Sequence, residues 1–328
     1  MPTTSSASHR KKFIVYAGGI FISYFYYGIM QEKVTRGKYT TTIEENGVTA
    51  SKTEKFTFTL ILVAVQCLIN TIVAKIATFI WPQGEDKTHK LYYASMSITY
   101  LLGMICSNMA LQWVPYPTQV VGKAAKPIPV MILGVLLGKM SYPLRKYVFV
   151  FMIVLGIILF MLKDKAEVLT EDAGVGVGEL LLFLSLLMDG LTGAIQDRIR
   201  AETRPTGLQM MFVGNAWSTF FLTIMILVTK EYILFYDFVL RYPFVLTNLL
   251  ILGLTSSVGQ LFLYNMVSEF GPLVLSVVTT TRKFFTVLFS VIIFRNNLTL
   301  RQWSGTIIVF AALFLDAFYS KKRPPKNK

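Results

Sequence analysis

The sequence is poor in the side chains that carry out most enzyme chemistry. Of its 328 residues, only 2 are cysteine and 2 are histidine. His9 and His89 lie in separate polar segments, so no metal cluster and no Ser–His–Asp or Cys–His set can be built from them. Cys67 and Cys106 lie in apolar stretches, where a packing role is expected rather than a structural disulfide. We therefore expect no metal, no cofactor and no catalytic residue, and the sequence does not indicate an enzyme.

Charged residues are also scarce. They make up 15% of the chain, whereas 54% of the residues are hydrophobic, which excludes an ordinary soluble domain. A membrane-spanning helix needs about 20 mostly apolar residues, and ten stretches of the sequence provide them. The first is longer than the apolar part of a signal peptide, so we expect it to be retained. We predict an all-α membrane protein with ten transmembrane helices, at residues 13–31, 56–80, 91–113, 117–138, 144–162, 179–197, 207–229, 243–268, 272–294 and 301–319.

Acidic residues are fewer than basic ones. The 18 Asp and Glu against 32 Lys and Arg give a net charge of +14. The cations fall between the predicted spans and form no basic patch with interleaved aromatic residues, so nucleic acid is not an expected partner. They are more numerous on the side of the two termini, which predicts that both termini are cytosolic.

The acidic segment 163–178 divides the chain into two halves of five spans. An odd number of spans per half means that the second half enters the membrane inverted, as in transporters built from inverted repeats. The predicted parts are a cytosolic tail at residues 1–12, a first repeat at 13–162, a lumenal linker at 163–178, a second repeat at 179–319 and a basic cytosolic tail at 320–328.

A few cations lie inside the predicted spans, namely Lys75, Lys123, Lys126, Arg282 and Lys283. The last four, here called the central cations, occur at similar depths of spans four and nine. Each charge at mid-membrane costs about 2.5–3.5 kcal/mol, so an offset is required. One possibility is pairing with an acid inside a span, such as Asp189 or Asp316. The other is an anionic substrate, for which lysines three residues apart on one helix face and a planar guanidinium are suited.

Polar and aromatic residues accompany the central cations. Tyr116 and Gln119 precede Lys123 and could stack on a base or read its edge. Thr279 belongs to a run of hydroxyls before Arg282, which could bind phosphate or sugar, although such hydroxyls also bond to their own helix. Pro127 removes a backbone donor beside the cations, which predicts a kink; the kink would permit gating, or it is a packing bend without a gating role. Gly134 and Gly138 form a GxxxG pattern, which favours close helix packing.

Four stretches of the sequence carry a resemblance to a known family: YFYYGIMQEKVTRGKY, PYPTQVVGKAAKPIPVMILG, LLMDGLTGAIQDR and TTTRKFFTVLFSVI. They resemble the nucleotide-sugar transporters, solute carrier family 35, of the drug/metabolite transporter superfamily. The nearest branch is the B branch, which includes UDP-galactose transporter homologues also described as endoplasmic reticulum ATP/ADP exchangers. The resemblance extends over nearly the whole chain.

The resemblance implies a ten-helix inverted repeat that works by alternating access in the endoplasmic reticulum or Golgi membrane. It implies phosphate-binding roles for the central cations, a neighbouring polar contact at Gln119 and a charged residue near the gate at Glu32. The expected partners are the lipid bilayer and a nucleotide or nucleotide-sugar substrate, whereas the oligomeric state stays open.

The expected function is exchange of a cytosolic nucleotide-sugar, of the UDP-galactose or UDP-glucose type, for a lumenal nucleotide. Exchange of ATP for ADP is an alternative, since four cations suit the higher charge of ATP. Other classes are a non-transporting membrane scaffold, a cation or drug exporter, which would need acids instead of bases in its cavity, and a glycosyltransferase. The last would need an acidic motif in a large lumenal loop, and the candidate loop at residues 32–55 has only mixed charges.

Overall fold

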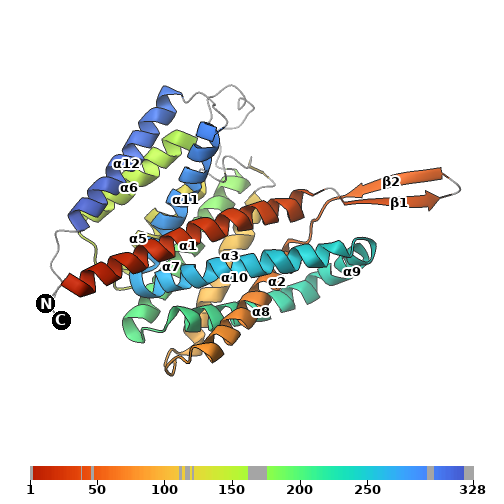
Figure 1. The fold of residues 1–328 in the computed structure, drawn as a ribbon, viewed down its shortest axis with the longest axis horizontal. Helices are drawn as coiled ribbons and strands as arrows, with labels where there is room; N and C mark the ends of the chain where they lie inside the picture. The colour runs from red at the N-terminus through yellow and green to blue at the C-terminus, as the bar shows by residue number, and fades with distance from the viewer. Residues whose placement is uncertain are drawn as a thin grey trace. The chain divides into compact units, whose positions relative to one another are not determined.

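The computed structural model describes residues 3–37, 39–45, 48–110, 113–114, 119, 122–161, 176–293 and 299–320. These residues form helices together with one two-stranded sheet (Figure 1). The helices are α1 (Thr3–Arg36), α2 (Thr59–Ile80), α3 (Lys90–Ala110), α5 (Pro127–Leu136), α6 (Leu144–Met161), α7 (Val177–Glu202), α8 (Gly207–Thr229), α9 (Glu231–Arg241), α10 (Phe244–Phe270), α11 (Pro272–Ile293) and α12 (Leu300–Ser320).

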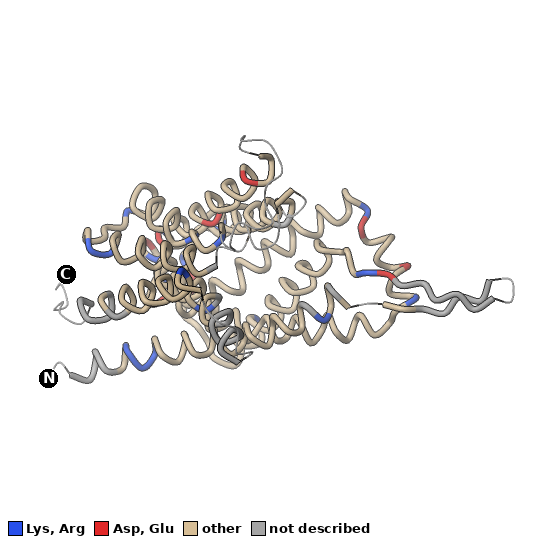
Figure 2. Tube along the Cα trace, turned by 90° about the horizontal axis from the view of Figure 1, so that it is seen from above, with Lys and Arg blue, Asp and Glu red and all other residues tan. Residues whose placement is uncertain are grey.

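The helices have the composition of membrane spans. In the described residues, five of them, α1, α2, α7, α8 and α10, are long and apolar enough to cross a bilayer. Large apolar side chains such as Phe79, Leu144 and Val228 are exposed, which is stable in lipid but costly in water. Charged residues gather mainly toward the helix ends (Figure 2). The predicted class, a helical protein with several membrane spans, is confirmed, and every predicted span contains a helix, whereas the total of ten spans stays a prediction.

Residues 32–55, which the sequence analysis treated as a loop of mixed charge, contain a β-hairpin in addition to the end of α1. Strands β1 (Tyr39–Glu45) and β2 (Val48–Glu54) pair in an antiparallel register from Tyr39 opposite Glu54 to Glu45 opposite Val48. The strands are rich in Thr, a β-branched residue that favours strands, and the sequence between them is Asn-Gly, a dipeptide typical of two-residue hairpin turns. The mixed charges of the segment concealed this pattern.

Tyr39 anchors the hairpin to the helices. Its ring packs against Phe238 and Tyr242, and its hydroxyl donates to the carbonyl of Val34 at 2.8 Å. Burial raises the pKa of the Tyr39 phenol, which keeps it a neutral hydrogen-bond donor. Phe238 belongs to α9, a short helix that the sequence analysis did not predict because it is too short to span a membrane.

The chain forms two compact units. Unit 1 contains Met1–Ile98 and Thr203–Phe270, and unit 2 contains Thr99–Glu202 and Gly271–Lys328. Each unit draws on both halves of the chain, so the units cut across the predicted repeats. Within unit 1, α2 packs along α8, and within unit 2, α5 packs against α11 and α6 along α12. These partners are the second, fourth and fifth spans of the two predicted halves.

Buried polar side chains tie the helices of unit 1 together. The Asn70 amide of α2 donates to the Asn215 oxygen of α8 at 3.3 Å, and the Ser257 hydroxyl of α10 donates to the Asn70 oxygen at 2.8 Å. Hydrogen bonds of this kind help to hold helices together where lipid supplies no hydrophobic driving force.

Two glycines bring α6 and α12 of unit 2 into backbone contact. A Cβ added at Gly156 would lie 2.8 Å from the carbonyl oxygen of Gly305, and one added at Gly305 would lie 2.6 Å from that of Gly156. Small residues at such crossings allow the close packing that stabilises helices in membranes.

We predict that Gly156→Ala lowers stability by about 1–3 kcal/mol, because the new methyl group forces the two backbones apart. Gly28→Ala is the matched control, since Gly28 is an exposed helical position with no atom within 4 Å of an added Cβ. Thermal unfolding of the detergent-purified variants measures the difference. Equal melting temperatures for the two variants would contradict the close crossing.

Candidate functional site

The chain around the first two central cations is not the continuous kinked helix that the sequence predicted. Residues 122–124 are helical, residues 125–126 form a turn, and α5 begins at Pro127. The carbonyl of Lys123 accepts from the Lys126 amide at 3.3 Å, and that of Ala125 accepts from the Ile128 amide at 3.0 Å. Hydrogen bonds between residues three apart, as in a 3₁₀ turn, thus replace the hydrogen bonds between residues four apart that the prolines remove. Pro127 starts a helix, where its missing donor costs little, instead of bending one.

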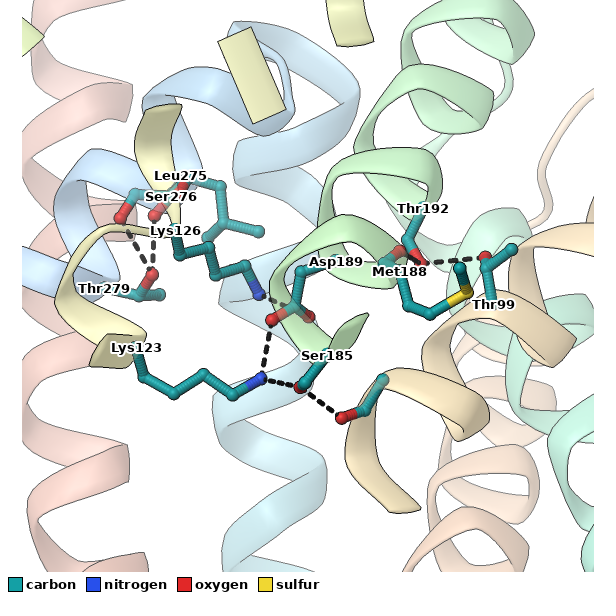
Figure 3. A network of polar contacts seen from close by, with 11 residues as sticks. Thr99, Lys123, Lys126, Ser185, Met188, Asp189, Thr192, Leu275, Ser276 and Thr279 are labelled. Atoms are coloured by element: carbon teal, nitrogen blue, oxygen red, sulfur yellow. Dashed lines mark hydrogen bonds and ion pairs between the residues drawn. The ribbon is translucent and has the colours of Figure 1, made fainter. Parts of the chain in front are cut away.

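Lys123 and Lys126 both contact the carboxylate of Asp189 in α7 (Figure 3). The Lys123 ammonium group donates to Oδ2 at 2.8 Å, and the Lys126 ammonium group donates to Oδ1 at 3.2 Å. The expectation that the two lysines share a face is confirmed. Lys123 also donates to the hydroxyl of Ser185, which in turn donates to the carbonyl of Gly103 in α3. We call these residues, Lys123, Lys126, Ser185 and Asp189, the lysine–aspartate cluster.

The cluster carries a net positive charge. Two ammonium groups face a single carboxylate, so one positive charge is not compensated within the cluster. The side chains of Lys123 and Asp189 are 15% and 12% exposed, whereas that of Lys126 is 37% exposed. The sequence left open whether these lysines pair with a protein acid. Both do, but they share the same one, Asp189.

Close packing between α5 and α7 sets the position of Asp189. An added Cβ at Gly190, the next residue, would lie 2.9 Å from the carbonyl oxygen of Pro129. Further along, added Cβ atoms at Gly134 and Gly138 would lie within 3.1 Å of Asp197 atoms. The GxxxG pattern therefore has the predicted role in helix packing.

Two other predicted site residues use polar atoms in hydrogen bonds to backbone carbonyls of the protein. Gln119 is buried, and its amide nitrogen donates to the carbonyl of Ser107 at 2.6 Å. The Thr279 hydroxyl donates to carbonyls of its own helix, those of Leu275 and Ser276, at 3.0 and 3.1 Å (Figure 3). Both residues belong to unit 2, as does Arg282, which is half-buried on α11.

The remaining predicted site residues cannot be placed. Tyr116 and the side chains of Glu32 and Lys283 lie outside the described residues. Lys75 is described and belongs to unit 1, where it lies on the surface of α2 with its ammonium group 5.1 Å from the centre of the Phe212 ring.

Sequence reasoning missed Ser185 and gave Asp189 no role beyond that of a pairing acid. The available signal was their spacing, because residues four apart lie on one helix face. Gly193 continues that face and contacts Val130 of α5.

Hollows elsewhere in the protein do not involve the predicted site. One of about 520 Å³ is lined mainly by apolar residues of α8 such as Trp217, and one of about 490 Å³ lies between the end of β2 and α9. No predicted site residue lines either of these two hollows.

The fold and the cluster together define a class. A chain of apolar helices that holds a positively charged cluster inside is a multi-pass membrane protein of the kind that carries solutes. Comparison with known proteins agrees, because the model of the UAA transporter family matches residues 12–320. The chain therefore belongs to the UAA transporter family.

Relatives from several animals cover nearly the whole chain. It is 53% identical over 316 residues to the "Solute carrier family 35 member B1 homolog" of Drosophila melanogaster, which covers 96% of this chain and 92% of that protein. It is 50% identical over 304 residues to the "Solute carrier family 35 member B1" of Mus musculus, covering 92% of each chain. The corresponding protein of Danio rerio is 46% identical over 316 residues, which cover 96% of this chain and 94% of that protein. The resemblance to solute carrier family 35 is thereby confirmed.

The shared carboxylate predicts an order of stability among variants that lack substrate. Asp189→Ala leaves the part-buried Lys123 and the more exposed Lys126 without their shared partner and should cost about 3 kcal/mol, the low end for a buried pair. Lys123→Met leaves Asp189 paired with Lys126 and should cost less, about 1–2 kcal/mol. Lys75→Met, an exposed control, should be nearly neutral. Thermal unfolding in detergent measures all three, and an equal loss for Asp189→Ala and Lys123→Met would rule out the shared arrangement.

Proposed function

We propose that the chain is a nucleotide antiporter of the endoplasmic reticulum or Golgi membrane, with both termini in the cytosol. It exchanges a cytosolic nucleotide-sugar, of the UDP-galactose or UDP-glucose type, for a lumenal nucleotide by alternating access. The observation that carries this proposal is the lysine–aspartate cluster, in which two ammonium groups share one carboxylate and keep a net positive charge within an apolar bundle.

The central cations would bind the phosphates of the nucleotide. Gln119, Tyr116 and Thr279 would contact the base or the sugar, with the Thr279 oxygen acting as an acceptor because its proton is donated to its own helix. Glu32 would act near the gate. Because α5 begins at Pro127, the cationic segment before it could move relative to α5.

Obligate exchange follows from the charge of the site. Phosphates of the substrate neutralise the cations, so the loaded carrier can reorient. An empty carrier keeps an uncompensated charge that is costly to expose to lipid. For the same reason the carrier needs a counter-substrate: a second nucleotide has to occupy the site before the carrier can return.

An ATP/ADP exchanger that supplies the lumen is a second candidate. The central cations less Asp189 leave a formal charge of about +3, which exceeds the charge of a UDP-sugar, about −2, and approaches that of ATP, about −4. A non-transporting scaffold would leave this charge without a ligand.

We predict that Lys126→Ala abolishes nucleotide exchange in proteoliposomes, because it removes the more exposed ammonium group of the cluster. The control is Lys75→Ala, which removes an exposed cation of unit 1 that lies over the Phe212 ring and should leave exchange unchanged. Exchange by Lys126→Ala at the rate of the unsubstituted protein would refute the proposed site.

Counterflow separates the candidates. Proteoliposomes loaded with unlabelled nucleotide are expected to take up labelled UDP-galactose, and empty proteoliposomes are not. Uptake of labelled ATP without uptake of UDP-galactose would favour the ATP/ADP exchanger. Uptake of neither would favour the scaffold.

A further inference from the structure

The carboxylate of Asp189 occupies the lysine pair in the way that a phosphate group would. Each of its two oxygens accepts from a different ammonium group, Oδ2 from Lys123 and Oδ1 from Lys126. A phosphate presents the same kind of oxygen edge with more charge and more acceptor positions. Asp189 and an incoming phosphate therefore compete for the same donors.

The two lysines are not held equally. Lys123 donates to both Asp189 and Ser185, and its side chain is 15% exposed. Lys126 makes the longer contact, 3.2 Å, is 37% exposed, and contacts no other carboxylate within the described part of the chain. A ligand can therefore recruit Lys126 while Lys123 remains fixed by Ser185.

We propose that Asp189 is a positioning residue that holds the lysine pair when substrate is absent and yields it to the phosphates of an arriving nucleotide. This inference rests on the proposed function and deepens it, because it assigns the internal competitor of the substrate. Asp189 sets the net positive charge that the lysine pair presents to a ligand, and it takes the lysines back when the ligand leaves.

Removing the competitor has two opposite effects. In Asp189→Asn the lysines are available without displacement, so anions bind more tightly. Release becomes slower for the same reason, since no internal carboxylate reclaims the lysines. A purely structural role of Asp189 would instead weaken binding and slow exchange together.

The test compares the unsubstituted full-length protein with Asp189→Asn and Asp189→Glu. In proteoliposomes, Asp189→Asn should lower the half-saturating nucleotide concentration about tenfold or more and lower the maximal exchange rate. Its preference among mono-, di- and triphosphates of one nucleoside should shift toward higher negative charge. Asp189→Glu keeps the carboxylate and should stay close to the unsubstituted protein in both respects.

A second measurement does not depend on transport. Pyrophosphate should raise the melting temperature of detergent-purified Asp189→Asn at concentrations about tenfold lower than for the unsubstituted protein. The double variant Asp189→Asn with Lys123→Met serves as a second comparison in case Asp189→Asn does not fold. It keeps the cluster at one positive charge, as in the unsubstituted protein. It should lose the charge preference of the single variant.

The outcomes separate this inference from the proposed function. An unchanged or higher pyrophosphate requirement in Asp189→Asn, or parallel loss of affinity and rate, would overturn the role of Asp189 while leaving nucleotide exchange intact. No nucleotide exchange by the unsubstituted protein, together with the expected shift for pyrophosphate, would overturn the proposed function and leave the competition between Asp189 and anions standing.

Discussion

A single carboxylate shared by two ammonium groups is the interaction on which the site depends. Asp189 accepts from Lys123 and from Lys126, so the cluster is neither neutral nor fully unpaired. With no acid, two charges would each carry the cost of about 2.5–3.5 kcal/mol that a bilayer centre imposes. With one acid for each lysine, no attraction would remain for an anion. Sharing lowers the cost of folding and still leaves one positive charge uncompensated within the cluster.

The geometry of this contact comes from local backbone features. Both lysines point toward α7 because the helical turn ends at residues 125–126 and α5 begins at Pro127. On the other side, Gly190 lets α7 approach the backbone of Pro129, which brings the neighbouring Asp189 within reach. Proline and glycine act here through what they lack, a backbone donor in one case and a side chain in the other. Both residues determine where the charges meet.

The sequence was sufficient for the class, the approximate position of the helices and the common face of the two lysines, because long apolar runs and helical spacing are strong local signals. It was insufficient where tertiary contacts decide. Asp189 is one of several acids in or near the spans, and no local pattern says which lysine it meets. Gln119 and Thr279 carry polar groups suited to a ligand, but packing gives them partners within the protein. The hairpin at residues 39–54 was missed because its strands combine threonines with charged residues and were read as a loop of mixed charge.

The location of the cluster within one unit bears on how a carrier could use it. Lys123, Lys126, Ser185 and Asp189 all belong to unit 2, and α5 and α7 pack directly on each other. The charge balance is therefore a property of a single packed body and does not depend on where that body is placed. A protein that alternates between two open states has to keep its phosphate-binding groups together throughout the cycle. A cluster built inside one unit satisfies this requirement, because its two lysines and Asp189 are held together within unit 2, where α5 and α7 pack on each other.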